Sequence, residues 1–369
     1  MSRFQHKIIY DPVPFIGGSK IAVHRALAGN VSDIDLVVTS NTDFWKNLGY
    51  NTRTLHCPNF LSDGSHGLCF FIKNFIFAIQ IIWINIFISR ISIAVGISGP
   101  GTDYALYIAK FFIGNKIIQL VQGPTPLSKT VGKCFLKAER IFYLPSSYIT
   151  IKNAIERAVG EEITEYELNN KGKYQEFING IPASDWPKHC LYGSNTIFWA
   201  ASLLKWKGLE IFTSALDKVE GKQYQAKICY IVPSDNSLPM DNVPTEKENI
   251  ACYENPSSLD LIREKCEIFV STSKQEPFGL SILESLAAGM CVVIPSDGAY
   301  WDLALQDGKN CRKYTPDDDK DLANILSELL KDENQLRMIG KKGAELALNY
   351  KAEDTYLNIK TMILNNVGL

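Results

Sequence analysis

The chain has 369 residues, of which 46% are apolar and 21% charged, and its formal net charge is −2. A chain of this length can form two domains with separate cores, and its composition is that of a folded, soluble protein. The balanced charge argues against nucleic acid as a partner. The nine cysteines form no Cys-x-x-Cys pair and the five histidines do not cluster with them. We therefore expect free thiols in a reducing compartment and no bound metal.

The first half of the chain alternates short apolar runs with segments of helical periodicity, which predicts a parallel sheet built from βαβ units. The start of the chain has no basic region followed by an apolar run, so we expect no signal peptide and a cytoplasmic protein. The expected strands are 7–10, 35–39, 92–97, 116–121 and 140–144, and the expected helices are 20–28, 103–112 and 127–138.

The segment Phe70–Ile88 is unusually apolar, and its polar residues are Lys73, Asn74, Gln80 and Asn85. Its length approaches that of a membrane span. A buried crossover helix of an α/β domain is the favoured interpretation. A helix lying in the membrane interface is the second, and a true span is the third, because Lys73 would lie inside the span.

A polar stretch over 160–174 and the turn-forming segment Ala183–His189 predict a domain boundary, with a hinge in the latter segment. The first domain is expected over 1–184 and the second over 185–351. The second half repeats the α/β alternation, with an exposed insertion at 233–247. Its expected strands are 196–200, 227–232, 249–253, 267–271 and 291–294, and its expected helices are 209–219, 257–265, 279–288 and 318–330.

The most informative motif is the strand–loop–helix junction that starts at Ser271, in which the helix begins near Gly279 and Leu280. A helix start exposes unpaired N–H groups and favours a phosphate, and a glycine there lets the anion approach the backbone. Glu284, inside the helix, can accept hydrogen bonds from the hydroxyls of a ribose. Glu276, in the loop, can reach a sugar on the other side of the phosphates. This pattern favours a pyrophosphate with a polyol at each end.

Two further strand–loop–helix junctions carry related features. Lys205 and Lys207 follow a strand of the second domain, where an ammonium group could face an anion above the carboxyl edge of the sheet. Gly17 and Gly18 follow the first strand and would bring the backbone close to a ligand. Each of these residues, taken alone, is also explained as a solvated charge or an ordinary tight turn. Their combination favours a binding site.

Together these motifs resemble those of the retaining glycosyltransferases of the GT-B fold, in the large family numbered four. The resemblance is strongest between Thr196 and Tyr314 and extends more faintly over the whole chain. The matching residues are Glu276 and Glu284 with Pro277-Phe278-Gly279-Leu280 between them, Ala287-Ala288-Gly289, Lys207-Gly208, Asn179-Gly180-Ile181 and Gly17-Gly18.

The resemblance implies an α/β protein with two Rossmann-like domains, whose parallel sheets face each other across a cleft, and a C-terminal helix within 352–369 that returns to the first domain. It implies retaining, metal-independent transfer of a sugar from a nucleotide-diphosphate sugar, without a cofactor. Glu276 and Lys207 are the expected catalytic residues. The expected donor-binding residues are Gly17, Gly18, Lys205, Lys207, Glu276, Phe278, Gly279, Leu280 and Glu284.

The acceptor expected from the resemblance is a saccharide or a polyprenyl-linked saccharide. If residues 70–88 contact a membrane surface, the lipid-linked form is the natural acceptor. The protein would then lie peripherally on the inner face of the cell membrane and act in the synthesis of a bacterial surface polysaccharide.

The sequence departs from the family pattern at two places. The family commonly has Gly-Arg where this chain has Ala201-Ser202, and Lys205 would have to supply the missing charge. Many members have a His where this chain has Gln122, which can donate a hydrogen bond but not a proton. Ser202 and Gln122 are therefore candidates for residues on the acceptor and phosphate side of the site, and this side differs from the family pattern. They leave open a degenerate binding protein that has kept the fold without the activity.

Three other enzyme classes are less consistent with the sequence. A metal-dependent transferase could use Asp33-Ile-Asp35, but these carboxylates precede a strand and should lie at its amino end, away from the ligand edge. A nucleotide-sugar epimerase of similar architecture remains an alternative. A dehydrogenase is disfavoured because the first turn lacks Gly-x-Gly-x-x-Gly.

Overall fold

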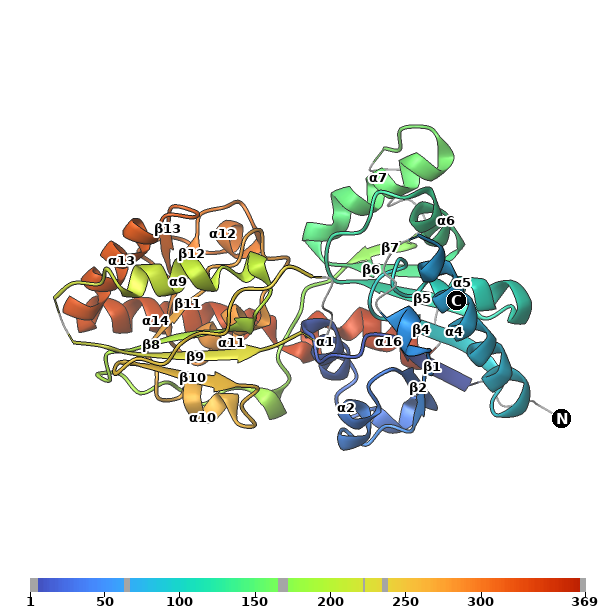
Figure 1. Ribbon diagram of the computed structural model, residues 1–369, viewed down its shortest axis with the longest axis horizontal. Coiled ribbons are helices and arrows are strands. Elements are labelled where there is room, and N and C mark those ends of the chain that lie inside the picture. The colour runs from blue at the N-terminus through green and yellow to red at the C-terminus, as the bar shows by residue number, and fades with distance from the viewer. Residues whose placement is uncertain (1–5, 63–66, 165–171, 222, 234–237, 366–369) are drawn as a thin grey trace. The chain divides into compact units, whose positions relative to one another are not determined.

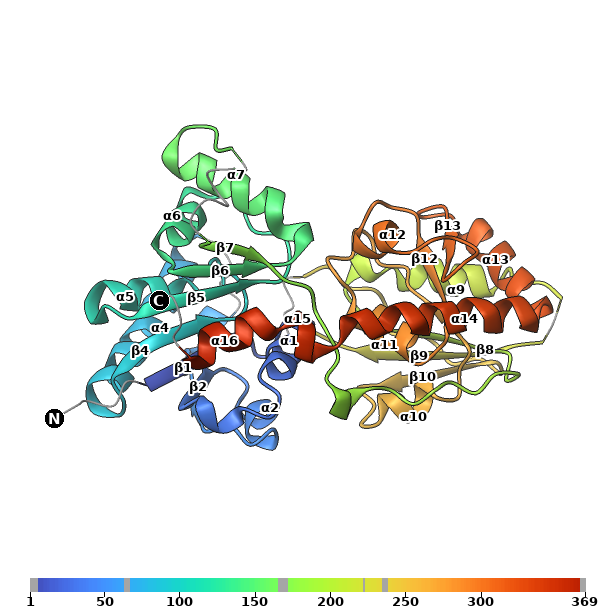
Figure 2. The ribbon, with the colours of Figure 1, turned by 180° about the vertical axis from the view of Figure 1, so that it is seen from behind.

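The computed structural model describes residues 6–62, 67–164, 172–221, 223–233 and 238–365. The chain divides into two compact units (Figures 1 and 2). The first unit comprises residues 1–180 and 352–369, and the second comprises 181–351. The division lies four residues before the expected boundary at 184.

The first unit contains a seven-stranded sheet in the order β3-β2-β1-β4-β5-β6-β7, in which neighbouring strands are parallel. Its central strands are apolar and buried, as expected for a parallel sheet covered on both faces. The strands are β1 (His6–Asp11), β2 (Leu36–Thr39), β3 (Thr52–Thr54), β4 (Ile91–Gly96), β5 (Lys116–Val121), β6 (Arg140–Tyr143) and β7 (Tyr174–Glu176).

Helices connect these strands in the βαβ manner that the sequence predicts. They are α1 (Gly18–Ala26), α2 (Thr42–Asn47), α3 (Asn59–Ser62), α4 (Gly67–Phe87), α5 (Tyr104–Ile113), α6 (Lys129–Lys137) and α7 (Tyr148–Val159). The chain returns to this unit through α15 (Ala352–Thr355) and α16 (Leu357–Asn365). The Tyr356 hydroxyl donates to Asn179 Oδ1 at 3.0 Å, and Lys360 Nζ lies 3.5 Å from the carbonyl of Ala28.

The segment expected as a buried crossover helix is α4, which connects β3 to β4. Its crossover position was predicted correctly, but its burial was not. Only one face, carrying residues such as Phe77, Ile81 and Ile84, packs in the core, while large apolar side chains on the opposite face are exposed. The helix is long and apolar enough to cross a membrane, and 28% of its most apolar 18-residue stretch is buried.

The second unit contains a six-stranded parallel sheet in the order β10-β9-β8-β11-β12-β13. In chain order this is 3-2-1-4-5-6, the order of a dinucleotide-binding Rossmann fold. The strands are β8 (Thr196–Ser202), β9 (Gln225–Ile231), β10 (Ile250–Glu254), β11 (Ile268–Val270), β12 (Cys291–Pro295) and β13 (Arg312–Tyr314). Two Rossmann-like α/β units, each with a parallel sheet, are therefore confirmed.

Helices pack on both faces of this sheet, and a core of aliphatic and aromatic side chains lies beneath them (Figure 1). They are α9 (Leu209–Leu216), α10 (Leu259–Arg263), α11 (Leu280–Ala287), α12 (Tyr300–Ala304), α13 (Asp319–Lys331) and α14 (Glu333–Ala347). The segment 233–247, expected as an exposed insertion, is partly integrated: Asp241 is buried and its N–H donates to the carbonyl of Leu203 at 2.8 Å. Residues 234–237 lie outside the described part.

Candidate active site

The sheet order of the second unit fixes where a ligand would bind. From β8 the chain leads to β9 on one side, whereas β11 lies on the other side of β8. Loops that leave neighbouring strands in opposite directions open a crevice at the carboxyl ends of those strands. The loop after β8 contains Lys205 and Lys207, and the loop after β11 contains Glu276. The topology thus brings these two predicted motifs to one sheet edge.

Hydrogen bonds hold the two loops together. The Thr272 hydroxyl donates to the carbonyl of Lys207 at 2.8 Å and accepts from Trp199 Nε1 at 3.0 Å. The N–H of Lys274 donates to the carbonyl of Trp206 at 2.9 Å. Gly208 has φ of +70°, and a Cβ there would lie 2.5 Å from the carbonyl oxygen of Thr272. Glycine is needed at this position both for its conformation and for the close approach of the loops.

Lys207 and Glu276 meet across the two loops. The ammonium group of Lys207 donates to Glu276 Oε2, and only 15% and 13% of the two side chains are exposed. The same ammonium lies 3.9 Å from the centroid of the Trp206 ring, within the range of a cation–π contact. Trp206 was not singled out from the sequence, although its place between two lysines was a usable signal. The catalytic pair expected from the sequence is therefore assembled in the second unit.

The start of α11 lies beside this pair. Gly279 has φ of +74°, and a Cβ there would come within 2.9 Å of Glu276 Cγ. Among the residues that the structure describes, the backbone N–H groups of Gly279, Leu280 and Ser281 have no hydrogen-bond partner. All three residues are partly exposed. These N–H groups and the positive end of the helix dipole form a site suited to an anion.

Phe278 has a structural place in this loop. Its side chain is 2% exposed and packs against Tyr300, Trp301 and Tyr350, with ring centroids 5.0, 5.2 and 6.2 Å away. The hydroxyls of Tyr300 and Tyr350 lie 3.0 Å apart. This aromatic cluster holds the loop between β11 and α11 in place through the ring of Phe278. The ring of Phe278 therefore supports the donor loop, and only its backbone is available to a ligand.

Glu284 lies on α11 one turn beyond Leu280, and its carboxylate is partly exposed. Its Oε2 accepts a hydrogen bond of 2.5 Å from Arg263 Nη2, and Arg263 also pairs with Asp260. The Arg263 side chain is 2% exposed. A buried guanidinium thus fixes the carboxylate expected to bind the ribose. Sequence analysis missed Arg263, because it lies among the charged residues of a short helix with no motif around it.

Lys205 does not join Lys207. Its ammonium pairs with Glu210 at 2.7 Å and with Asp241 at 3.3 Å, and the hydrogen bond that it donates to Glu210 raises the pKa of Lys205. Asp241 also accepts from the N–H of Leu209 at 3.1 Å, so this carboxylate occupies the start of α9. Ser202 is the last residue of β8 and pairs in register with Ile231. The two lysines therefore serve different partners.

In the first unit, Gly17 and Gly18 begin α1, with Gly17 as an extended N-cap residue. Gln122 follows β5, and its Nε2 lies 3.3 Å from the carbonyl of Ser19 and 3.4 Å from that of Ile97. The structure therefore brings Gln122 to the glycine loop at the carboxyl edge of this sheet. Its amide binds backbone carbonyls there.

A buried charged cluster lies at the same edge and was not predicted. Asp11, the last residue of β1, accepts hydrogen bonds from Lys20 Nζ at 2.5 Å, from Thr39 Oγ1 at 2.9 Å and from Trp45 Nε1 at 2.8 Å. Burial lowers the pKa of Lys20, against the opposing effect of Asp11. The cluster ties α1 and α2 to the sheet.

The carboxylates of the Asp-x-Asp alternative lie where the sequence analysis expected them. Asp35 immediately precedes β2 and accepts from the N–H of Lys7 at 2.6 Å, and Asp33 accepts from Asn30 Nδ2 at 2.8 Å. Both are at the amino end of the strand. In the part of the chain that the structure describes, no group of three or more His, Cys, Asp and Glu side chains is arranged to hold a metal ion.

The family comparison concerns the unit that contains these loops. The model of the family described as glycosyl transferases group 1 matches residues 188–346, which all fall within the second unit. The match covers most of the second unit. The match contains Lys207, Glu276, the start of α11 and Glu284. No curated protein matches the chain.

Solved structures of glycosyltransferases resemble the whole chain. HepE of Anabaena in complex with UDP and glucose is 14% identical, with a TM-score of 0.73, and the match covers 98% of this chain and 100% of that one. Sucrose-phosphate synthase of Thermosynechococcus elongatus is 13% identical, with a TM-score of 0.69 and coverage of 98% and 99%. The lipopolysaccharide outer core galactosyltransferase WaaB is 14% identical, with a TM-score of 0.60 and coverage of 99% and 100%. The fold is GT-B, and with the family match the chain is a glycosyltransferase.

Proposed function

We propose that this glycosyltransferase transfers a sugar from a nucleotide-diphosphate sugar with retention of the anomeric configuration and without a metal ion. The observation that carries the proposal is the convergence of Lys207, Glu276 and the start of α11 at the switch point of the second unit. That HepE was solved with UDP and glucose, at 14% identity, supports a nucleotide sugar as the donor.

In the proposed reaction, cleavage of the sugar–phosphate bond leaves negative charge on the departing diphosphate. The unpaired N–H groups of Gly279 and Leu280 and the ammonium of Lys207 stabilise this charge. These groups can act without a metal ion, since they themselves supply positive charge and hydrogen-bond donors to the diphosphate. Ser202, where the family has an arginine, gives no positive charge, so Lys207 carries a larger share of the stabilisation.

The two carboxylates are proposed to bind hydroxyl groups on either side of the diphosphate. Glu276 orients the transferred sugar, and Glu284, held by Arg263, accepts hydrogen bonds from the ribose. Glu276 also aligns Lys207 in the absence of the donor, so donor binding has to rearrange or share this ion pair. Neither carboxylate acts as a nucleophile in this proposal.

The acceptor is proposed to be a saccharide or a polyprenyl-linked saccharide, in the synthesis of a bacterial surface polysaccharide at the cytoplasmic side of the membrane. WaaB is a lipopolysaccharide outer core galactosyltransferase, which supports an acceptor of this class. The absence of a cofactor and the cytoplasmic location remain predictions from the sequence.

The proposal is tested by transfer and donor-hydrolysis assays on Lys207→Ala and Glu276→Ala. Lys207→Ala should lower kcat about 10²–10³-fold, the range found when one donor to a developing negative charge is removed. Glu276→Ala should lower it about 10²-fold, because the transferred sugar is no longer held in position. EDTA should leave the wild-type rate unchanged, and the product should keep the donor's anomeric configuration by NMR.

Lys218→Ala is the matched control, because Lys218 also forms an ion pair with a carboxylate, that of Asp319, but on the surface at the far end of α9. It should keep the wild-type rate. Near-normal turnover in both test variants would refute the assigned roles. An inactive wild-type protein that still binds the nucleotide would instead indicate the degenerate binding protein.

A further inference from the structure

The outward face of α4 exposes an apolar surface on the first unit. Its buried side carries Asn74, Phe77, Ala78, Ile81 and Ile84, which pack on the unit's core. The opposite side is also apolar, and at the end of α5 Phe111 is 81% exposed. The exposed apolar residues, called here the α4–α5 surface, are Leu68, Phe71, Ile72, Phe75, Ile79, Trp83, Ile86, Phe87, Phe111 and Phe112.

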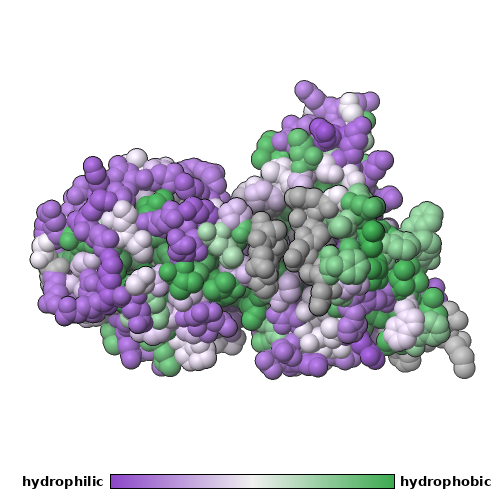
Figure 3. Space-filling view, viewed as in Figure 1, coloured by the Kyte–Doolittle hydropathy of each residue, from purple (hydrophilic) through white to green (hydrophobic). Residues whose placement is uncertain are grey.

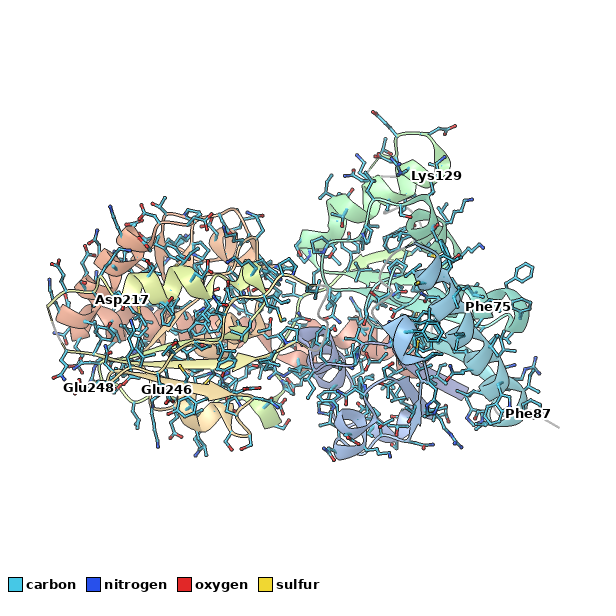
Figure 4. The ribbon with its side chains drawn as sticks, viewed as in Figure 1. Phe75, Phe87, Lys129, Asp217, Glu246 and Glu248 are labelled. Carbon is cyan, nitrogen blue, oxygen red and sulfur yellow. The ribbon has the colours of Figure 1, made fainter. Side chains whose placement is uncertain are left out.

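Figure 3 shows where this surface lies on the first unit. Hydrophobic residues gather in Figure 3 at the right of the view, where Figure 1 places α4 and α5. Figure 4 shows Phe75 and Phe87 pointing away from the body of the unit. Helices α4 and α5 pack directly against each other, so their exposed side chains adjoin. A surface this apolar on a folded unit indicates a binding partner.

Unpaired positive charge lies beside the α4–α5 surface. Between residues 67 and 138 the only acidic residue is Asp103, which is fully buried. In the part of the chain that the structure describes, five exposed basic residues of this stretch have no ion-pair partner. They are Arg90, Lys116, Lys129, Lys133 and Lys137. Arg90 and Lys116 stand at the starts of β4 and β5, next to the ends of α4 and α5 that carry Phe87 and Phe111.

From the apolar face and its basic rim we infer that the α4–α5 surface docks the protein on an anionic lipid bilayer. Apolar side chains enter the interface between headgroups and acyl chains, and the lysines and arginine face the negative headgroups. A second copy of this chain fits less well, because docking two copies through this face would oppose like-charged rims.

The polar residues of α4 decide between docking and spanning. Asn74 Oδ1 accepts from the N–H of Ala105 at 3.0 Å, and Asn85 Oδ1 accepts from the N–H of Ile91 at 2.8 Å. Gln80 bonds both the N–H and the carbonyl of His56, at 2.9 and 2.8 Å. Crossing a bilayer would break all of these contacts and leave the amides in hydrocarbon. The helix therefore lies in the plane of the interface as part of the unit.

Docking on the membrane does not depend on catalysis. The preference for a lipid-linked acceptor, however, follows from docking. Only the step to a lipid-linked saccharide rests on the proposed function, because a membrane-bound enzyme and a membrane-bound acceptor share one surface. Binding to vesicles and binding of nucleotide can be measured separately, so either proposal can fail alone.

The test is flotation of the full chain with phosphatidylglycerol–phosphatidylcholine vesicles and with phosphatidylcholine vesicles. We expect the wild type to float with the anionic vesicles at low salt. The fraction that floats with neutral vesicles should be at least tenfold smaller. The fraction that floats with anionic vesicles should fall as added salt screens the charges. Phe87→Glu/Phe111→Glu should abolish flotation, and Lys116→Glu/Lys137→Glu should reduce it at least tenfold. Extraction at alkaline pH should release the protein.

Leu303→Glu and Lys320→Glu/Lys341→Glu are the controls, because Leu303 is 79% exposed and both lysines are exposed, all in the second unit. They should float like the wild type. All variants should keep the wild-type melting temperature and its shift with nucleotide diphosphate. Any of four results would overturn the inference: no flotation, equal binding to neutral vesicles, resistance to alkaline extraction, or self-association through Phe111 without vesicle binding.

Discussion

Asp103 shows what burial does to a single charge in this fold. The carboxyl is fully buried at the start of α5, where Oδ2 accepts hydrogen bonds from Gln119 Nε2 at 2.7 Å and from the N–H of Ser98 at 2.9 Å. Burial raises its pKa to about 8 despite these bonds. Gly96 makes room for the group, since a Cβ there would lie 2.7 Å from Oδ2. The folded protein therefore holds a proton on Asp103 near neutral pH.

A pH dependence of stability follows from this raised pKa. Between about pH 4 and pH 8 the folded state binds more protons at Asp103 than the unfolded state, so this group's contribution to stability falls as pH rises through that window. Asp103→Asn cannot ionise and should flatten the decline in the free energy of unfolding, measured by urea titration from pH 5 to 9. The exposed Asp43→Asn is the control. An Asp103→Asn protein with the wild-type slope would refute the assignment.

The residues of the candidate site were predictable to different degrees. Glu276, Lys207 and Gly279 belong to motifs whose spacing is visible in the sequence, and the loops bring them together. Arg263 and Asp241 act through pairing with residues far along the chain, and nothing in their local sequence marks those partners. Phe278 was expected at the donor, but the aromatic cluster that buries its ring comes from distant segments.

At the scale of elements, the central strands and the edge strand β10 were predicted well, and the other three edge strands were not. Strands such as β4 and β12 are largely apolar, because both faces of a central parallel strand are covered. The edge strands β3, β7 and β13 are three residues long and largely polar, so hydropathy gave no signal for them. Helix α7 was also missed, although Ile151, Ala154 and Ile155 have helical spacing.

Helix α14 was missed for another reason. Gly340 and Gly343 resemble helix breakers in the sequence, but both lie on its buried face. A Cβ on Gly340 would lie 2.2 Å from the carbonyl oxygen of Gly289 and 2.7 Å from the Tyr192 hydroxyl. The glycine thus allows the helix to approach the loop before β12 more closely than any other residue would.

Gly340→Ala should therefore destabilise the protein, even though alanine favours a helix by about 1 kcal/mol over glycine. Overpacking at a rigid backbone contact costs about 1–3 kcal/mol, and we expect a net loss of stability in chemical denaturation. Lys341→Ala, at the next and exposed position, should change stability by less than about 0.5 kcal/mol. A Gly340→Ala variant as stable as the wild type would show that the contact can relax.

At the scale of the whole molecule, the function depends on how the second unit presents its sheet edge. The order 3-2-1-4-5-6 places the loops after β8 and β11 side by side, and it does so whatever the detailed sequence of the strands. The parallel α/β class could thus be predicted from the alternation of apolar runs and helical segments, and the GT-B architecture from the resemblance of the motifs to the family. The exposure of the α4–α5 surface could not be predicted, because the sequence of a long apolar helix does not show whether one of its faces or both are buried.

Thermal unfolding with a panel of nucleotide diphosphates shows whether Lys207 and the N–H groups at the start of α11 bind a diphosphate. A ligand present at 100 times its dissociation constant stabilises the folded state by about 2.7 kcal/mol. We expect at least one nucleotide diphosphate to raise the melting temperature of the wild type, and Lys207→Ala to lose most of this shift while Lys218→Ala keeps it. No shift with any nucleotide diphosphate, or a full shift in Lys207→Ala, would contradict the account.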